Sequence, residues 1–503
     1  MASTSLAARV LTRSAARRAR YRPRAYDRTP LPTERELHVL NRLGCGFSVG
    51  SYKQLVKAGG PMEWFEAQLD HEAVPESARA AGLAAWFPRL WNDPATKYAD
   101  DRADVYKNHE YGRDLSNYSL LRRIYSTRTV FESMVELWSN HLHVEARHFP
   151  GFTHRADYDT TIRAHALGSF ADLLVAASLH PAMLLYLDNW RSKADLPNEN
   201  HGRELLELHT VGRGAGYTEQ MVKDSAKILS GWTMTDDDKY VRKFDSARHA
   251  IGPVNVLGFS HANGVRNNPD LAEQYLRYLA MHPATAQRIC HKIAVRFVSD
   301  EPSTQLVDAM AAAYLAHHSD IKATLRAMVA SDEFWDSAGQ KVRTAIDDVV
   351  ATCRVLRMKA KAPRRQRSFA RAISHSIDDT FVYHWPRPDG PPDRAAVSAS
   401  TTRMLNSWRM HWQLGGGLYP HEDVAFRPPV KFLPDSGMRF DELVDHMCRS
   451  LLGRPSTAAL LEAACKGCDV APGDTITKRH AVMRHKFPRL TSAVLDTTEH
   501  MTR

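Results

Sequence analysis

Long apolar runs are missing from this sequence, and so is any apolar segment behind its paired arginines. The most apolar stretch, residues 171–187, is interrupted by polar residues and a proline, and it is shorter than the roughly 20 residues that a spanning helix needs. Arg17 and Arg18 are followed by ARYRPRAYDRTPLP, which excludes a twin-arginine or general secretory signal. We therefore predict no transmembrane segment, no signal peptide and a cytoplasmic location.

Cysteine is scarce, with six residues in a chain of 503. Only Cys465 and Cys468 lie close together, as CKGC, and one CxxC supplies half of a zinc site. No second CxxC or HxxxH accompanies it. Scattered cysteines are typical of a reducing compartment, which excludes a disulfide framework. The sequence leaves the role of Cys465 and Cys468 open.

The familiar catalytic signatures are also missing. The chain contains no Walker motif, no dinucleotide fingerprint and no HExxH. No repeat of fixed period recurs, which disfavours a solenoid. A function must therefore be sought in constellations of residues rather than in a standard motif.

Acidic residues are almost absent from the first 30 positions, which hold eight Arg and one Asp. This segment supplies +7 of the net charge of +10, so the basic character of the chain is local. A segment with charge of one sign is typical of a solvated chain. We predict a basic disordered tail over residues 1–33 and no binding to nucleic acid.

The rest of the chain shows helical periodicity. Apolar residues recur at i, i+3 and i+4 from residue 119 onward, and Ala- and Leu-rich stripes with short loops follow from residue 270. Val, Phe and Tyr at close spacing after Trp232 indicate one small β-hairpin. The predicted fold is mainly α, a multi-helix bundle-like body, with a helical core over residues 34–360 and a C-terminal helical and loop region over residues 361–503 packed on it.

The stretch that carries most chemistry is residues 197–232, which begins with Pro197 and the helix-capping Asn198. At about 100° per residue, the polar members of the first helix fall within one arc of about 140°, and His209 falls among leucines on the other side. A solvated face is the alternative to a site. The arc contains Glu199, Asn200, Arg203, Glu204 and Glu207.

A second helix, predicted over residues 130–148, carries His141, which we expect to face the Glu-rich helix. If that helix is continuous, His141, Glu145 and His148 lie on one face. Metal sites in helix bundles draw Glu and His from facing helices. A divalent transition metal is therefore the cofactor that this pair of helices could hold, and a hydrogen-bonding role for each histidine is the alternative.

Several segments resemble the domain-of-unknown-function 1800 family of bacterial proteins. They occur in the family's order and run from about residue 36 to about residue 420: LNRLGCGFS, LWSNHLHV, NENHGRELLELHTVG, YTEQMVKDSAKILSGW and AMHPATAQRICHKIAVRFVSDEP. The resemblance implies a largely helical fold, a bacterial source and a partner from the domain-of-unknown-function 1501 family, but no mechanism. The family has His-Asp and then Lys where this chain has His249, Ala250 and Val254.

Two functions remain open from the sequence. The favoured one is a scaffold or assembly partner whose Glu, Arg and His side chains form a buried network that fixes helix register. The alternative is a metal-dependent or carboxylate-assisted enzyme with a Glu/His site between helices 130–148 and 198–210. The candidate residues are His141, Glu199, Arg203, Glu204, Glu207 and His209, with Asn140, Asn198 and His249 as secondary candidates.

Overall fold

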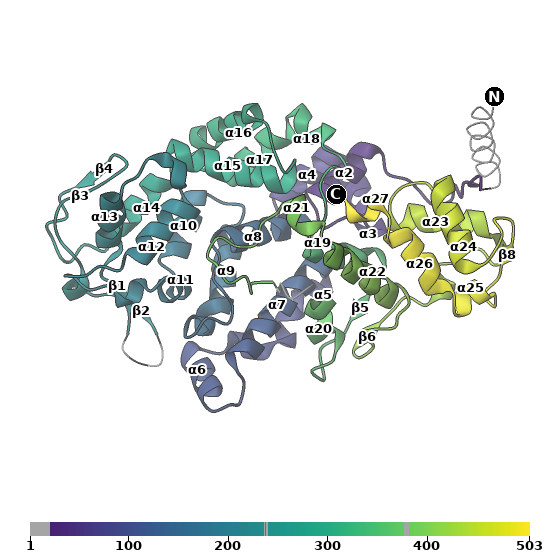
Figure 1. The fold of residues 1–503 in the computed structure, drawn as a ribbon, viewed down its shortest axis with the longest axis horizontal. Coiled ribbons are helices and arrows are strands. Elements are labelled where there is room, and N and C mark those ends of the chain that lie inside the picture. The colour runs from purple at the N-terminus through teal and green to yellow at the C-terminus, as the bar shows by residue number, and fades with distance from the viewer. Residues whose placement is uncertain (1–20, 236, 238–239, 377–381) are drawn as a thin grey trace, which may run out of the picture. The chain divides into compact units, whose positions relative to one another are not determined.

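The structure is a computed structural model that describes residues 21–235, 237, 240–376 and 382–503. The chain forms two compact units, of which unit 1 comprises Met1–Glu66, Ala338–Asp378 and Ser398–Arg503. Unit 2 comprises Ala67–Ser337 and Asp379–Val397. The fold is mainly α with small antiparallel sheets, as the sequence predicts (Figure 1). None of the described helices is long and apolar enough to cross a membrane.

Unit 1 gathers helices from both ends of the chain around apolar faces. Thr33 caps its first helix in a capping box with Glu36, and Ser48 caps the second, as the sequence indicates. Residues 361–378 lie in the same unit as residues 338–360. Its elements are α2 Glu34–Arg42, α3 Val49–Ala58, α19 Ala345–Val355, β5 Lys359–Ala360, α20 Phe369–Ala372, α22 Thr401–Gly415, β6 Val424–Ala425, β7 Met438–Arg439, α23 Phe440–Leu451, α24 Ala458–Cys468, β8 Thr475–Ile476, α25 Ala481–Arg484, α26 Phe487–Leu495 and α27 Thr498–Met501.

The segment expected to be a tail over residues 1–33 falls partly outside the described residues, which begin at residue 21. The described part contacts the C-terminal portion of unit 1. The backbone N–H of Tyr26 donates to Asp445 Oδ2 at 2.7 Å, and its hydroxyl donates to Asp435 at 2.6 Å. Arg449 donates to the Thr29 carbonyl at 3.2 Å. Residues 21–33 are therefore bound to the unit by specific hydrogen bonds.

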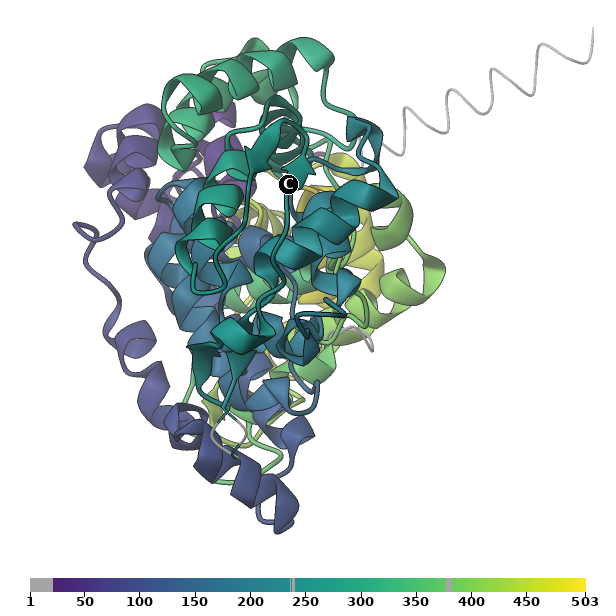
Figure 2. The ribbon, with the colours of Figure 1, turned by 90° about the vertical axis from the view of Figure 1, so that its left-hand side faces the viewer.

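Unit 2 is a set of helices with two small hairpins, in which α14 to α17 follow one another as packed neighbours (Figures 1 and 2). The helices α4 Pro61–Leu69 and α21 Ala395–Ser398 lie at the boundaries between units. The elements of unit 2 are α5 Ala78–Ala81, α6 Pro94–Arg102, α7 Asn108–Tyr125, α8 Thr129–His141, α9 Arg155–His165, α10 Phe170–Ser178, α11 Pro181–Tyr186, α12 Glu199–Glu204, α13 Glu219–Leu229, β1 Trp232–Met234, β2 Arg242–Phe244, β3 Val254–Val256, β4 Phe259–His261, α14 Asp270–Ala280, α15 Pro283–Phe297, α16 Thr304–Ala316, α17 Ile321–Val329 and α18 Asp332–Asp336.

The region after Trp232 forms two hairpins instead of one. Strand β1 pairs antiparallel with β2, with Trp232 opposite Phe244. Strand β3 pairs antiparallel with β4, with Val254 opposite His261. The β-hairpin expected here is confirmed, and the second one follows it directly in the chain.

The helix predicted over residues 130–148 is too long, because α8 ends at His141. The backbone beyond it bonds to other parts of unit 2 in place of a further helical turn. The hydroxyl of Tyr158 donates to the Leu142 carbonyl at 2.7 Å, and Arg155 Nε donates to the Val144 carbonyl at 2.9 Å. Glu145 and His148 therefore do not continue the helical face of His141.

Candidate functional site

The Glu-rich segment is an α-helix that widens into a π-helical turn. Helix α12 ends at Glu204 and Leu205–His209 form the π turn. The hydroxyl of Thr210 donates to the Leu205 carbonyl at 2.7 Å, which holds the wider turn closed. A π turn inserts one residue into the helical register and is frequent at functional sites. The regular helix predicted over residues 198–210 is therefore wrong after Leu205.

Gly202 lets α12 lie directly against α13. A Cβ atom at this position would be 2.9 Å from the Ala226 nitrogen and 3.1 Å from the Val222 carbonyl oxygen. Both are backbone atoms that cannot move without displacing the helix. The close contact between the two helices thus depends on glycine.

The carboxylates of the predicted arc are divided among separate partners. Arg203 binds Glu219 through two hydrogen bonds of 2.6 and 2.8 Å and reaches Glu199 at 3.3 Å, where all three side chains contact solvent. Glu207 pairs with the exposed Arg213. Exposed pairs of this kind contribute little to stability. The arc behaves as a partly solvated face between Glu199 and Arg203.

Glu204 differs from its neighbours because it has no arginine bonded to it in the described part of the chain. Burial raises the pKa of this carboxyl, and the nearby Glu207 raises it further. Arg203 and Arg213 act in the opposite direction. Glu204 thus holds its proton to a higher pH than an ordinary glutamate carboxyl does.

His141 and His209 come together, as the predicted facing of the two helices requires. Both are buried, and their ring centroids lie 6.2 Å apart. His141 Nε2 lies 3.0 Å from the backbone carbonyl of His209. Because a carbonyl only accepts, Nε2 carries the proton of the neutral ring and Nδ1 is left as an acceptor. Nδ1 is buried and has no hydrogen-bond partner in the described parts of the chain.

Both histidines are neutral over the physiological range. Burial lowers the pKa of His141 well below its usual value of 6.5, and the positive charge of Lys292 lowers it further. Burial likewise lowers the pKa of His209 to about 3. A neutral imidazole with a free acceptor nitrogen can take a proton from a bound molecule.

A cavity of about 310 Å³ lies beside His141 and has walls from α8, α15 and the strap, which we define as residues 385–394. Asn140 and His141 line it from α8, and Lys292 and Arg296 line it from α15. The strap has no regular secondary structure and is attached at both ends. His143 Nε2 donates to the Trp385 carbonyl at 2.8 Å, and Asp393 accepts from Arg296 at 3.0 Å.

Gly390 allows the strap to touch α8. Its φ is +67°, and a Cβ atom there would lie 2.0 Å from the backbone oxygen of Asn140. No other residue type fits such an approach without moving one of the two backbones. This contact closes the cavity on the side of Asn140.

Lys292 supplies the second titratable group of the cavity. Burial lowers its pKa to about 8, and Arg288 lowers it further while Asp389 opposes the shift. The carboxylate of Glu136 on the same wall is already bound, to Arg123 at 2.7 Å and to Arg296 at 2.6 Å. The cavity therefore combines a neutral histidine acceptor with a lysine whose ammonium loses its proton near pH 8.

The secondary candidates have separate roles. Asn198 caps α12 by accepting from the Asn200 N–H at 2.9 Å. His249 is fully buried, with its ring nitrogens 2.9 Å from the Ser230 carbonyl and 2.8 Å from Asn263 Oδ1. Both contacts hold backbone in place away from the cavity. Asn140 alone of the three lines it.

The geometry of a metal centre occurs elsewhere in the chain. Within the described ranges, one group of three or more His, Cys, Asp or Glu side chains has ligand spacing: Asp348, His411 and His500 of unit 1. Arg403 lies 3.5 Å from Asp348 there. The predicted set of His141, Glu204 and Glu207 is not gathered around one point.

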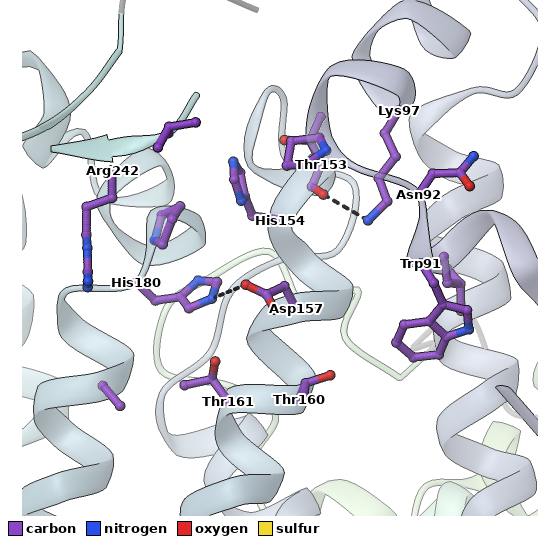
Figure 3. A pocket seen from close by; sticks show the side chains of 15 residues that line it. Trp91, Asn92, Lys97, Thr153, His154, Asp157, Thr160, Thr161, His180 and Arg242 are labelled. Atoms are coloured by element: carbon purple, nitrogen blue, oxygen red, sulfur yellow. Dashed lines mark hydrogen bonds and ion pairs between the residues drawn. The ribbon is translucent and has the colours of Figure 1, made fainter. Parts of the chain in front are cut away.

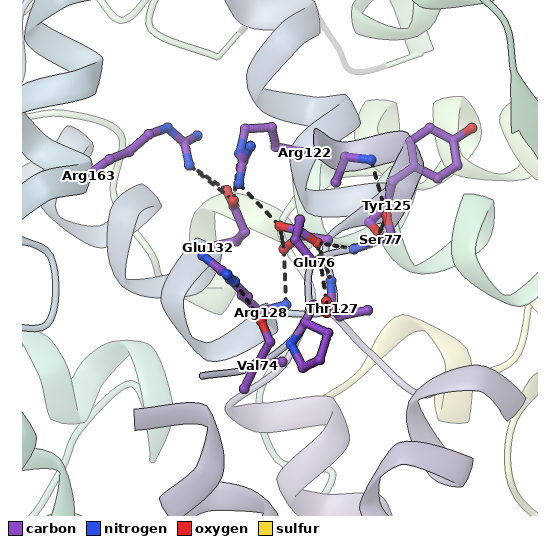
Figure 4. A network of polar contacts seen from close by, with 12 residues as sticks. Val74, Glu76, Ser77, Arg122, Tyr125, Thr127, Arg128, Glu132 and Arg163 are labelled. Atoms are coloured by element: carbon purple, nitrogen blue, oxygen red, sulfur yellow. Dashed lines mark hydrogen bonds and ion pairs between the residues drawn. The ribbon is translucent and has the colours of Figure 1, made fainter. Parts of the chain in front are cut away.

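A buried Glu/Arg network of the expected kind is present, although on other residues (Figure 4). Glu132 accepts from Arg122 at 2.8 Å and from Arg163 at 2.9 Å, and its side chain is 1% exposed. Arg122 continues to Glu76 at 3.3 Å. Burial raises the pKa of Glu76, but hydrogen bonds from Thr127, Ser126 and Ser77 outweigh it and lower the pKa. We call these four charged residues the Glu132 network.

Sequence reasoning missed Lys292, the strap and the Glu132 network. Two signals were available. Lys292 lies inside the segment AMHPATAQRICHKIAVRF, and the strap contains the PRPDGPP run, whose prolines and glycine mark an ordered loop. Glu132 and Glu136 sit on an otherwise apolar helix, four residues apart.

Fold and site together define a mainly helical protein with a small polar cavity enclosed by two helices and a strap. The chain belongs to the family described as "Protein of unknown function (DUF1800)", which matches residues 38–502. This confirms the relationship that the ordered motifs predict. No curated protein and no solved structure matches the chain.

Proposed function

We propose that unit 2 performs acid–base catalysis on a small substrate in the cavity beside His141. The observation that supports this is that one cavity is lined by His141, whose Nδ1 is an acceptor without a partner among the described residues, and by Lys292, a cation of lowered pKa. Titratable groups with such shifts in one cavity are typical of active sites. The metal-dependent alternative finds less support, because Glu199 and Glu207 are bound to arginines and the described residues do not gather Glu204 and Glu207 with His141 around one point.

Hydrolysis is the simplest reaction that this pair supports. His141 Nδ1 takes a proton from a bound water, and the hydroxide attacks an electrophilic carbon or phosphorus of the substrate. The Lys292 ammonium stabilises the negative charge that develops on the attacked group and donates a proton to the leaving group. As product leaves, His141 releases its proton to solvent and Lys292 takes up a proton from solvent, which restores both groups.

The test is a panel of p-nitrophenyl esters, phosphates and glycosides, assayed between pH 5 and 10. We expect turnover that falls as pH rises above about 8, because Lys292 loses its proton there. His141→Gln keeps a donor for the His209 carbonyl but removes the base, and should lower kcat by roughly 10²–10⁴-fold. Lys292→Met should lower kcat and abolish the decline at high pH.

Lys227→Met is the matched control, since Lys227 pairs with Asp224 at 3.2 Å on α13 away from the cavity. Its activity should equal that of the unmodified chain. Equal activity in His141→Gln, or no turnover of any of the three substrate types, would refute the hydrolytic mechanism.

Assembly is the second candidate function, and an exposed apolar stripe on α22 favours it. Leu405, Trp408 and Trp412 follow at i, i+3 and i+7 and are 56%, 43% and 41% exposed. Large exposed aromatic residues on one face mark binding surfaces. We propose that this stripe binds a protein of the domain-of-unknown-function 1501 family, while the Glu132 network keeps unit 2 rigid.

Co-purification of the two proteins from a joint expression tests the assembly role. The unmodified chain should retain the partner, and the double variant Trp408→Ser and Trp412→Ser should release it. Retention by the double variant would exclude the stripe, and failure of the unmodified chain to bind would exclude the partner.

A further inference from the structure

A second and larger cavity lies elsewhere in unit 2, with a volume of about 800 Å³. Its walls come from α6, from the 3₁₀ turn Gly151–His154, from α9, from the start of α11 and from β2. Figure 3 shows Lys97 reaching in from one side and Arg242 from the other, with His154, His180 and Asp157 between them. None of these residues takes part in the cavity beside His141.

Lys97 is a buried cation whose ammonium group can donate further hydrogen bonds. Its side chain is 4% exposed, and its Nζ donates to the Thr153 carbonyl at 3.0 Å. Burial lowers the pKa of Lys97 to about 8, while Asp157 and Asp93 oppose the shift. An ammonium has three donor positions, and a carbonyl carries no charge to balance it. A buried lysine without a bonded carboxylate favours an anion as its partner.

His180 and Asp157 form an oriented pair in the middle of the cavity. The Ala182 N–H donates to His180 Nδ1 at 3.1 Å, so the neutral ring carries its proton on Nε2. Nε2 donates to Asp157 Oδ2 at 3.0 Å. This bond lowers the pKa of Asp157, whose side chain is 70% exposed. Asp157 is therefore an ionised acceptor that faces the open space.

His154 adds a second acceptor atom, Nε2, to the cavity. Its side chain is buried, at 6% exposure, and Nε2 has no hydrogen-bond partner in the described parts of the chain. The backbone of Tyr240 bonds the ring and favours a proton on the other nitrogen, while burial lowers the pKa to about 4. A neutral ring of this kind leaves Nε2 to accept from a hydroxyl.

Apolar and neutral polar groups complete the wall. Trp91 and Asn92 line the cavity beside α6, and Thr160 and Thr161 line it from α9. The indole of Trp91 is partly exposed and offers a flat apolar surface. Flat aromatic faces next to hydroxyl and amide groups suit a ring that has C–H bonds on its faces and hydroxyls around its edge.

We propose that this cavity binds a polyhydroxylated organic anion, a sugar phosphate or a sugar acid. The anionic group lies against Lys97, while Arg242 faces it across the cavity and adds its positive charge at longer range. The hydroxyls donate to Asp157 and to His154 Nε2, and the ring packs on Trp91. This site is independent of the chemistry proposed for His141.

Calorimetric titration of the full-length chain tests the proposal with four probes: glucose 6-phosphate, glucuronate, glucose and inorganic phosphate. We expect one of the two sugar anions to bind at least tenfold more tightly than glucose or phosphate, and the preferred anion identifies the phosphate or carboxylate form. Lys97→Met should weaken that binding at least tenfold. Lys227→Met should leave it within twofold.

Arg242→Gln provides a second variant, because Arg242 is exposed and glutamine keeps a donor for the Leu179 carbonyl that Arg242 bonds at 2.9 Å. It should weaken binding at least threefold, and His141→Gln should have no effect. Equal affinity for glucose would overturn the anionic requirement, and equal affinity for phosphate alone would overturn the requirement for hydroxyls. Binding of neither sugar anion at millimolar concentration, or unchanged binding in both Lys97→Met and Arg242→Gln, would overturn the site.

Discussion

His411 is a positively charged side chain in the interior of unit 1. Its Nε2 lies 3.0 Å from Asp348 Oδ1 and its Nδ1 lies 2.7 Å from Asp496 Oδ1, so both nitrogens donate to carboxylates. Burial lowers the pKa, but Asp348 and then Asp496 outweigh it and raise the pKa to about 9. His500, which shares Asp348, has its pKa lowered to about 4 by burial. The two histidines thus divide into a cation and a neutral ring.

The positive charge of His411 predicts how the free energy of unfolding depends on pH. The pKa of His411 rises from about 6.5 in the unfolded chain to about 9 in the folded one, so its stabilisation is complete below pH 6.5 and is lost as pH rises through 9. The free energy of unfolding should therefore fall by on the order of 3 kcal/mol, since each unit of pKa difference corresponds to about 1.4 kcal/mol. Urea unfolding at pH 7 and pH 9.5 measures it.

His411→Gln is the control, because it removes the titrating group. Between pH 7 and pH 9.5 the unmodified chain should lose stability relative to His411→Gln, because Lys97 and Lys292, whose pKa values are about 8, titrate alike in both proteins. His500 does not disturb the comparison, since its pKa of about 4 places its titration below this range. Equal slopes in the two proteins would show that His411 is not charged in the fold.

Among the elements, the strap has one close backbone contact with α8, at Gly390. Gly390→Ala places a Cβ atom against the Asn140 carbonyl and strains a residue of positive φ. Such backbone strain costs roughly 1–3 kcal/mol, and we expect the strap to detach locally so that unit 2 itself stays folded. Hydrogen exchange should show faster exchange in residues 385–394 and little change in α12 and α13.

Gly214→Ala is the matched control for this prediction. No atom lies within 4 Å of a Cβ atom at Gly214, and its φ is not in the left-handed region. Exchange in the strap should stay as it is in the unmodified chain. Slow exchange of the strap in Gly390→Ala would contradict the view that this glycine contact holds the strap to α8.

The elements also show what the sequence could and could not predict. Periodicity identified α8 and α13, and turn residues located the break before α12, because these signals are local. The π turn at Leu205 depends on Thr210 bonding back across it, and the end of α8 depends on Tyr158 and Arg155 capturing its backbone carbonyls. Hydrogen-bond partners that lie outside a helical segment produce no periodic pattern in that segment's own sequence.

The sequence likewise predicted some parts of the candidate site and missed others. The sequence indicated that the helices of His141 and of residues 198–210 face each other, but it placed His209 on the side opposite the polar arc and did not predict its contact with His141. Lys292 comes from a helix about 150 residues further along, and the strap comes from beyond residue 380. Spacing within one segment cannot reveal which distant segments share a cavity, because side chains from several elements form it.

At the scale of the whole molecule, unit 1 depends on its described N-terminal segment. Deleting residues 1–30 removes the bonds of Tyr26 to Asp445 and Asp435, and Arg449 also loses the Thr29 carbonyl. Removing several buried hydrogen bonds should lower Tm by several degrees. Differential scanning calorimetry measures the change.

Deletion of residues 1–20 is the comparison for that experiment. These residues carry five Arg and no acidic residue, and we expect their removal to leave Tm almost unchanged. A similar fall in Tm for both deletions would show that the first 20 residues contribute to folding. An unchanged Tm for both would contradict the role assigned to Tyr26.

The bond between Tyr26 and Asp445 joins residues 419 positions apart, which has a consequence for the order of events during synthesis. At about 5–20 residues per second, a ribosome needs roughly 20–80 s after making Tyr26 before it makes Asp445. The whole continuous part of unit 2, Ala67–Ser337, emerges in that interval. The nascent N-terminal segment must wait, with the apolar faces of α2 and α3 uncovered, while the inserted unit completes its own folding. Chaperone demand should therefore peak in this interval, before release from the ribosome.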